Sequence, residues 1–123
     1  MKKIHCFSMV LSLIMISCTE YNEDRLIGSW QAVSVLEEGK PLDIETEVIQ
    51  ISFTPDGSYA YQSTLNYRES GSYYLDSKYL FTTDTINQAS TEKAVEIIML
   101  TEDSLQLKMM DTGKERLLKM VRK

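Results

Sequence analysis

The feature that most constrains the fold is an alternation of apolar and polar residues in short stretches. Ile49, Ile51 and Phe53 share one face of an extended segment, and polar residues fill the positions between them. Residues 54–57, Thr-Pro-Asp-Gly, follow directly. Proline presets its own φ and glycine accepts a positive φ, so this tetrapeptide favours a tight turn. The pattern predicts two strands joined as a hairpin.

The same pattern recurs and predicts about eight strands. No segment of the domain keeps helical apolar spacing over three turns, and most joints are short and polar. The expected strands are residues 29–36, 47–53, 59–64, 71–75, 78–83, 94–100, 104–110 and 115–122. Consecutive strands joined by tight hairpins form an up-and-down meander. Because closure removes both exposed edges, we expect an all-β fold, an antiparallel up-and-down barrel of about eight strands.

Closure of such a barrel makes a prediction about two residues. The first and last strands pair antiparallel, so the start of one lies beside the end of the other. Trp30 is therefore expected near Arg122, with the guanidinium stacked on the ring at the closed end. We interpret this pair as structural closure of the barrel.

The start of the chain differs from the rest. Lys2 and Lys3 precede an apolar run that ends at residue 16. This run is too short for a membrane span of about 20 residues, and a charged start before a short apolar run is typical of a secretory signal peptide. We therefore expect residues 1–17 to be removed.

Residues 15–18, Met-Ile-Ser-Cys, resemble the lipobox of bacterial lipoproteins, in which the cysteine is acylated and becomes the first residue. The resemblance implies lipid attachment at Cys18 and a membrane as partner. It places the protein in the cell envelope, with the outer membrane favoured and exposure at the cell surface left open. Residues 18–25 are polar and acidic and are expected to be a tether, which leaves residues 26–123 as the domain.

Composition after processing excludes several functions. His5, the only histidine, and Cys6 leave with the signal peptide, so a Ser-His-Asp or Cys-His site cannot be built and zinc lacks its usual ligands. We expect no enzyme, no cofactor and no metal site. Two lysines leave and no acid does, which changes the formal net charge from -5 to -7. Nucleic acid binding, which needs clustered cations, is therefore not expected.

Two groups of side chains are candidates for lining a ligand site. Tyrosines crowd the middle of the chain, and methionines recur in the last strands. Aromatic faces and flexible thioethers suit a small apolar ligand, whereas both residue types also fill ordinary strand cores. The candidate lining residues are Tyr59, Tyr61, Tyr73, Leu107, Met109 and Met120.

A family resemblance joins these observations. Residues 28–30, Gly-Ser-Trp, open the first strand and a late arginine ends the last, which resembles the Gly-x-Trp pattern of lipocalins. More narrowly, residues 53–59, 71–73 and 100–105 resemble lipocalin-like domains of short Bacteroidetes lipoproteins. The resemblance runs from Leu26 to Arg122 and implies a lipocalin-like barrel. The other lipocalin motifs are not clear, and no disulfide can form within the processed chain.

Two functions are compatible with such a domain. The first is non-catalytic binding of a small apolar or amphipathic molecule near the open end of the barrel. The alternative is a filled barrel that acts as a protein-protein interaction module for another envelope protein. A binder needs a cavity of about 300 Å³ or more. An interaction module is expected to be packed to the density of a protein interior.

Overall fold

The computed structural model describes residues 21–87 and 91–123. The expected signal peptide, residues 1–17, and the expected lipid attachment at Cys18 lie outside these residues. Of the helices that the structure describes, none has the length and apolar character needed to cross a membrane.

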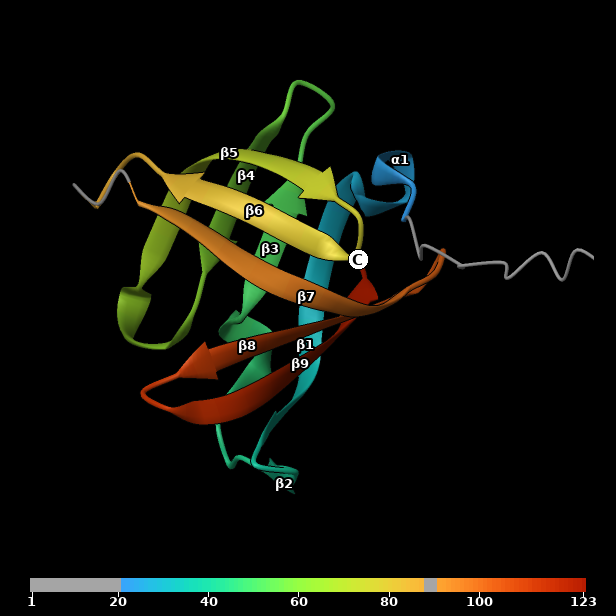
Figure 1. Ribbon diagram of the computed structural model, residues 1–123. Coiled ribbons are helices and arrows are strands. Elements are labelled where there is room, and N and C mark those ends of the chain that lie inside the picture. The colour runs from blue at the N-terminus through green and yellow to red at the C-terminus, as the bar shows by residue number, and fades with distance from the viewer. Residues whose placement is uncertain (1–20, 88–90) are drawn as a thin grey trace, which may run out of the picture.

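Strands make up most of the described chain (Figure 1). The elements are α1 (Glu23–Leu26), β1 (Gly28–Glu37), β2 (Lys40–Pro41), the 3-10 turn η1 (Thr46–Val48), β3 (Gln50–Phe53), β4 (Ser58–Gln62), the 3-10 turn η2 (Thr64–Asn66), β5 (Arg68–Asp76), β6 (Tyr79–Asp84), β7 (Glu92–Leu100), β8 (Ser104–Asp111) and β9 (Lys114–Arg122).

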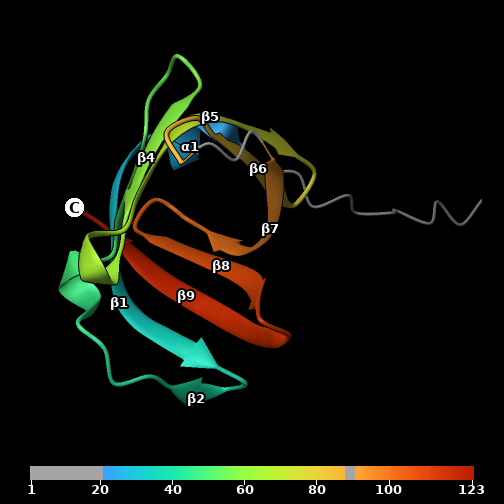
Figure 2. The ribbon, with the colours of Figure 1, turned by 90° about the vertical axis from the view of Figure 1, so that its left-hand side faces the viewer.

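All strands join one antiparallel sheet that closes on itself. From β3 to β9 each strand pairs with the next along the chain, and β1 pairs with both β3 and β9. The register across the closing seam runs from Trp30 opposite Arg122 to Glu37 opposite Arg116. Figure 2 shows the strands arranged in a ring. The expected eight-stranded all-β barrel is confirmed, and β2 is a two-residue addition to the end of β1.

Three local features differ from the expectation. β5 begins at Arg68 instead of residue 71, and the segment at 46–48 is a 3-10 turn instead of the start of a strand. The third feature is α1, which lies largely within the segment expected to be a tether. Its N-cap is Asn22, whose side chain accepts a hydrogen bond from the backbone N–H of Asp24. One helical turn is too short to leave an apolar period in the sequence.

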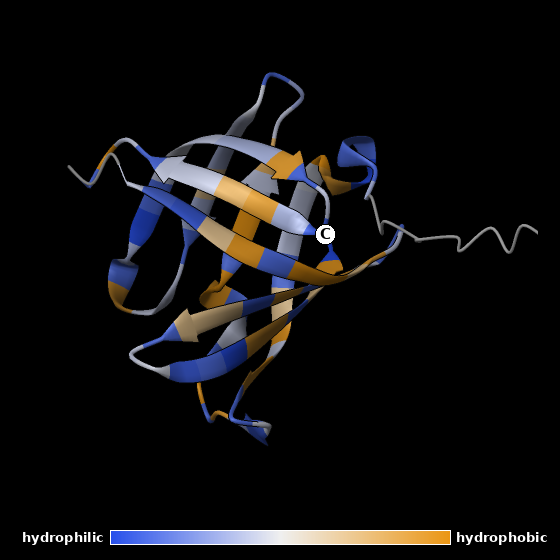
Figure 3. Ribbon diagram, viewed as in Figure 1, coloured by the Kyte–Doolittle hydropathy of each residue, from blue (hydrophilic) through white to orange (hydrophobic). Residues whose placement is uncertain are grey.

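Alternate residues of each strand point into the barrel and form the core. Ile49, Ile51 and Phe53 are buried, as the alternation predicted, and so are Leu105 and Leu107 on β8. Figure 3 shows the corresponding alternation of hydrophobic and hydrophilic segments along the strands. The barrel is therefore held together by the inward rows of its strands.

One end of the barrel is closed by Trp30. Its side chain is fully buried, and the indole N–H donates a 2.9 Å hydrogen bond to the carbonyl of Leu26 in α1. The Arg122 guanidinium lies 4.2 Å from the Trp30 ring centroid. Gly28 has a φ of +128°, and a Cβ there would collide with this guanidinium, so glycine is required for both reasons.

The Arg122 guanidinium also donates to three backbone carbonyls. These belong to Arg25 at 2.6 Å, Ile27 at 2.7 Å and Glu102 at 2.7 Å. One side chain thus joins α1, the start of β1, the β7–β8 turn and the end of β9. The pair Trp30 and Arg122 lies together at the closed end, in the structural position that the sequence predicted.

Replacing Arg122 is expected to destabilise the barrel. Arg122→Met removes the stacked cation and the charged donors to three carbonyls, and we expect the free energy of unfolding to fall by about 2–3 kcal/mol. Arg122→Lys should recover little of it, because an ammonium cannot reproduce the planar fork. Urea unfolding measures both, with Arg68→Met on the exposed face of β5 as control. An Arg122→Met variant as stable as the control variant would contradict this role.

Candidate ligand-binding site

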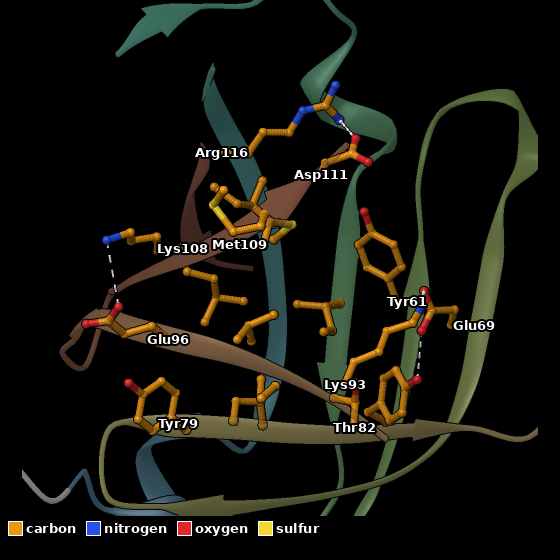
Figure 4. Close-up of a pocket in the computed structure, with 18 of the residues that line it drawn as sticks. Tyr61, Glu69, Tyr79, Thr82, Lys93, Glu96, Lys108, Met109, Asp111 and Arg116 are labelled. Atoms are coloured by element: carbon orange, nitrogen blue, oxygen red, sulfur yellow. Dashed lines mark hydrogen bonds and ion pairs between the residues drawn. The ribbon is translucent and has the colours of Figure 1, made fainter. Parts of the chain in front are cut away.

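A cavity of about 840 Å³ occupies the barrel at the end away from Trp30. Figure 4 shows its side chains converging from the strands around it. The size is within the range of about 300–1,000 Å³ typical of small-molecule sites.

The deep part of the cavity is apolar. Ile51, Leu80, Val95, Leu107 and Leu118 line it from β3, β6, β7, β8 and β9. Each stands at an inward position of its strand, and all but Val95 are buried. This floor offers a ligand dispersion contacts and the exclusion of water.

One polar wall is organised by the carboxylate of Glu69 on β5. It accepts hydrogen bonds from the hydroxyls of Tyr59 at 2.9 Å and Tyr67 at 2.8 Å, and from the Lys93 ammonium at 3.1 Å. The hydrogen bond to Glu69 raises the pKa of Tyr67 to about 12. Burial, followed by the same carboxylate, raises the pKa of Tyr59 as well. Both hydroxyls therefore stay protonated near neutral pH.

A second charged group lies across the mouth. The Arg116 guanidinium bridges the carboxylates of Glu37 at 2.9 Å and Asp111 at 2.8 Å, and the Lys114 ammonium lies 3.2 Å from Glu37. Hydrogen bonds from Arg116 and then from Lys114 lower the pKa of Glu37. The group carries balanced charge, so it gives the mouth a polar rim without a strong net field.

The predicted lining residues divide between the cavity and the core. Tyr59, Tyr61, Leu107 and Met109 line the cavity. Tyr61 also packs edge-on against Tyr67, with ring centroids 6.2 Å apart. Among these four, the Tyr59 hydroxyl is committed to Glu69, so its ring serves more as wall than as ligand donor.

Two further predicted lining residues, Tyr73 and Met120, are not among the residues that line this cavity. Tyr73 packs edge-on against Phe53 at 4.9 Å and its hydroxyl donates to the carbonyl of Thr54, near the closed end. Met120 lies opposite Leu105 and is buried. Both are buried in the core, Tyr73 beside the β3–β4 turn and Met120 near the β7–β8 turn that Arg122 contacts.

The sequence interpretation missed the charged lining residues Glu69, Lys93 and Arg116. Glu69 was missed because β5 was expected to begin at residue 71. Extending the alternation of Tyr73 and Gly71 back by two residues places Glu69 on the inward face. This alternation is the sequence feature from which Glu69 could have been predicted as a lining residue. Lys93 and Arg116 were passed over because a charged residue in a strand is usually a solvated one.

The arrangement is suited to binding. Within residues 21–87 and 91–123, no three His, Cys, Asp or Glu side chains gather as a metal site. In the same residues every buried side-chain nitrogen or oxygen has a hydrogen-bond partner. The cavity thus combines an apolar floor with polar groups that already satisfy one another, as in sites that hold an apolar molecule and orient its polar end.

The fold and this cavity define a small closed β-barrel with room for one ligand. Residues 26–107 match the family described as Lipocalin-like domain, and the chain belongs to that family. Curated proteins give no significant sequence match to this chain.

Solved structures show the same fold. A lipocalin-like protein from Bacteroides uniformis superposes with a TM-score of 0.59 at 16% identity, over 80% of this chain and 98% of that protein. An uncharacterized protein from Bacteroides eggerthii gives a TM-score of 0.57 at 15% identity, over 80% of this chain and 99% of that one. At such identities the likeness shows the fold alone.

Replacing Glu69 is expected to release the tyrosines of the polar wall. In Glu69→Gln the pKa of Tyr67 should fall from about 12 toward its ordinary value of 10.0, because the neutral amide holds the phenolic proton less strongly. Nuclear magnetic resonance of tyrosine labelled at Cζ follows each ring separately. Glu92→Gln, which replaces the charged partner of the Tyr74 hydroxyl by a neutral amide, is the matched control.

The same shift has a consequence for stability. A phenol whose pKa is raised by folding stabilises the native state fully below the unfolded pKa and loses that contribution as pH rises through the folded pKa. The wild-type melting temperature should therefore drop between about pH 10 and pH 12, more steeply than that of Glu69→Gln. Identical profiles for the two proteins would contradict the coupling of Tyr67 to Glu69.

Proposed function

We propose that the chain is a lipid-anchored lipoprotein of the cell envelope whose barrel binds one small apolar or amphipathic molecule without catalysing a reaction. The observation that carries the proposal is the cavity of about 840 Å³, with its apolar floor and polar rim. The cavity is open to solvent, so water covers its apolar floor in the free protein. A ligand that displaces this water gains the hydrophobic contribution of the apolar surface that it covers.

The cavity also favours ligand binding over the alternative, a filled barrel that contacts another envelope protein. Membership of the lipocalin-like family supports a binding or interaction module in general. The interior supports the first of these two. The proposed location is the outer membrane, and the membrane is the proposed partner through the acylated Cys18.

Filling part of the cavity is expected to weaken binding. Met109→Trp adds a ring to the β8 wall, and the dissociation constant of the bound molecule should rise about tenfold, a loss of about 1.4 kcal/mol, which lowers the fraction of protein that carries it. Native mass spectrometry of the full protein from the producing bacterium, followed by organic extraction, measures that fraction and the bound mass. Val121→Trp adds the same ring on the outer side of β9 and is the control. A wild-type protein that is apo in every preparation would overturn the binding proposal.

Lipid attachment has a separate test. Cys18→Ala should eliminate labelling by an alkyne-bearing fatty acid and release the protein from the membrane fraction, because several acyl chains are needed for stable anchoring. Cys6→Ala, within the expected signal peptide, should leave both properties unchanged. Unchanged labelling of the Cys18→Ala protein would contradict the lipoprotein proposal without affecting the cavity.

A further inference from the structure

The barrel wall is incomplete between β7 and β8. The β7–β8 register ends at Glu96 opposite Lys108, although β7 extends from Glu92 and β8 continues to Asp111. Within the residues that the structure describes, no β7–β8 pair lies beyond this point. We call the opening between residues 92–95 and residues 109–111 the slit. In Figure 4 the Glu96 and Lys108 side chains form an ion pair across the two strands, at the end of the slit where the pairing of β7 and β8 stops.

The cavity passes through the slit. Its lining includes the inward residues Val95 and Met109 and also the outward residues Ala94 and Met110, from the same two strands. Neighbouring residues of a strand face opposite sides of the sheet. One cavity can touch both sides only where the wall is open, so the barrel has a lateral opening in addition to its mouth.

The edges of the slit carry backbone hydrogen-bonding groups. The N–H of Ile97 donates to the carbonyl of Lys78, which directs alternate residues of β7 toward β6 and the others toward β8. Ala94 therefore turns its N–H and C=O toward the slit. On β8 the equivalent position is Met110, two residues beyond Lys108. On each strand these groups continue the row of backbone groups that begins at the Glu96–Lys108 pair, and they suit a ligand that contains an amide.

The cations beside the slit are all paired. Lys108 lies 3.9 Å from Glu96 and 3.8 Å from Glu115, and Lys93 is paired with Glu69. Arg116 is paired with Asp111. Of the described acids beside the slit, Glu92 has no ion pair and accepts a hydrogen bond from the Tyr74 hydroxyl. The slit therefore offers no unpaired cation to an anionic head group, and it favours a neutral polar end over an anionic one.

From these observations we propose that the slit is a lateral portal and binding subsite for a linear amphiphile with one apolar chain and a neutral, amide-bearing end. The apolar chain lies in the barrel, and the amide crosses the wall between Ala94 and Met110. A linear ligand is required because only an extended chain passes between two strands. This inference rests on the proposed binding function and specifies the ligand class and its route.

The sequence also allows the slit to close. Continuing the register from Glu96 and Lys108 would place Val95 opposite Met109, both inward and apolar. Two residues further along each strand it would place Lys93 opposite Asp111, a pair of opposite charges. The two strands can therefore pair along their full length, and a ligand in the slit competes with the hydrogen bonds that β7 and β8 would form with each other.

The test locks the slit shut by a disulfide. In the full chain with Cys6 and Cys18 replaced by serine, Ala94→Cys and Met110→Cys are introduced together. These residues are the next hydrogen-bonded pair, whose Cα separation of about 5.5 Å in a closed ladder suits a disulfide. The control carries Met99→Cys and Gln106→Cys, which staples a pair of the same two strands that is already formed, at residues that do not line the cavity.

Calorimetric titration with N-dodecanoylglycinamide measures the result. We expect the oxidised lock to bind the probe at least about tenfold more weakly than wild type, and reduction of the disulfide to restore binding. The oxidised control should bind like wild type. Methyl dodecanoate, which lacks amide donors, should bind wild type more weakly than the amide does.

A second variant gives a reading that needs no disulfide. Ala94→Trp places a ring over the outer opening of the slit, whereas Val33→Trp places one at an exposed position of β1. We expect only Ala94→Trp to weaken binding of the probe. If the oxidised lock and Ala94→Trp both bind the probe like wild type, the portal is wrong and the proposed function stands. If wild type binds neither probe, and is also apo when isolated, both proposals fail.

Discussion

Closure of β1 onto β9 is the constraint on which the rest of the structure depends. The two strands are the first and last of the barrel, and their pairing turns an open meander into a ring without exposed long edges. Arg122 holds this seam at one end through three carbonyls and the Trp30 ring. Buried apolar side chains pack around Trp30, and the cavity lies toward the other end of the barrel.

Polar groups are satisfied in different ways at the two ends of the barrel. At the closed end, the polar groups of Trp30 and Arg122 are used to satisfy backbone carbonyls, so a compact cap forms without a disulfide. At the open end, Glu69 and Arg116 are each surrounded by groups of opposite charge or by hydroxyls. Such internal pairing lets charged residues line a cavity beside an apolar floor without the cost of burying an isolated charge.

The fold was predictable because strand alternation is local and strong. The inward positions of Ile49, Ile51 and Phe53 follow from the period of two, and the seam between Trp30 and Arg122 follows from antiparallel closure. The candidate site was predictable only in part. Alternation tells which side a residue faces but not how far along the barrel it stands, and this is why Tyr73 and Met120 were grouped with Tyr61. The charged wall formed by Glu69 depended on the start of β5, and strand ends are the least certain feature of a sequence pattern.

The slit could not have been predicted from the sequence, because nothing in residues 92–95 or 109–111 opposes pairing. Val95 and Met109 suit a closed ladder, and so do Lys93 and Asp111. In the structure these two charges instead have partners elsewhere, Glu69 for Lys93 and Arg116 for Asp111. The open wall is therefore supported by the same ion pairs that line the cavity. A ligand that disturbed either ion pair would also shift the equilibrium between the open slit and the fully paired β7–β8 wall. Binding of a ligand in the barrel is therefore coupled to opening of the slit.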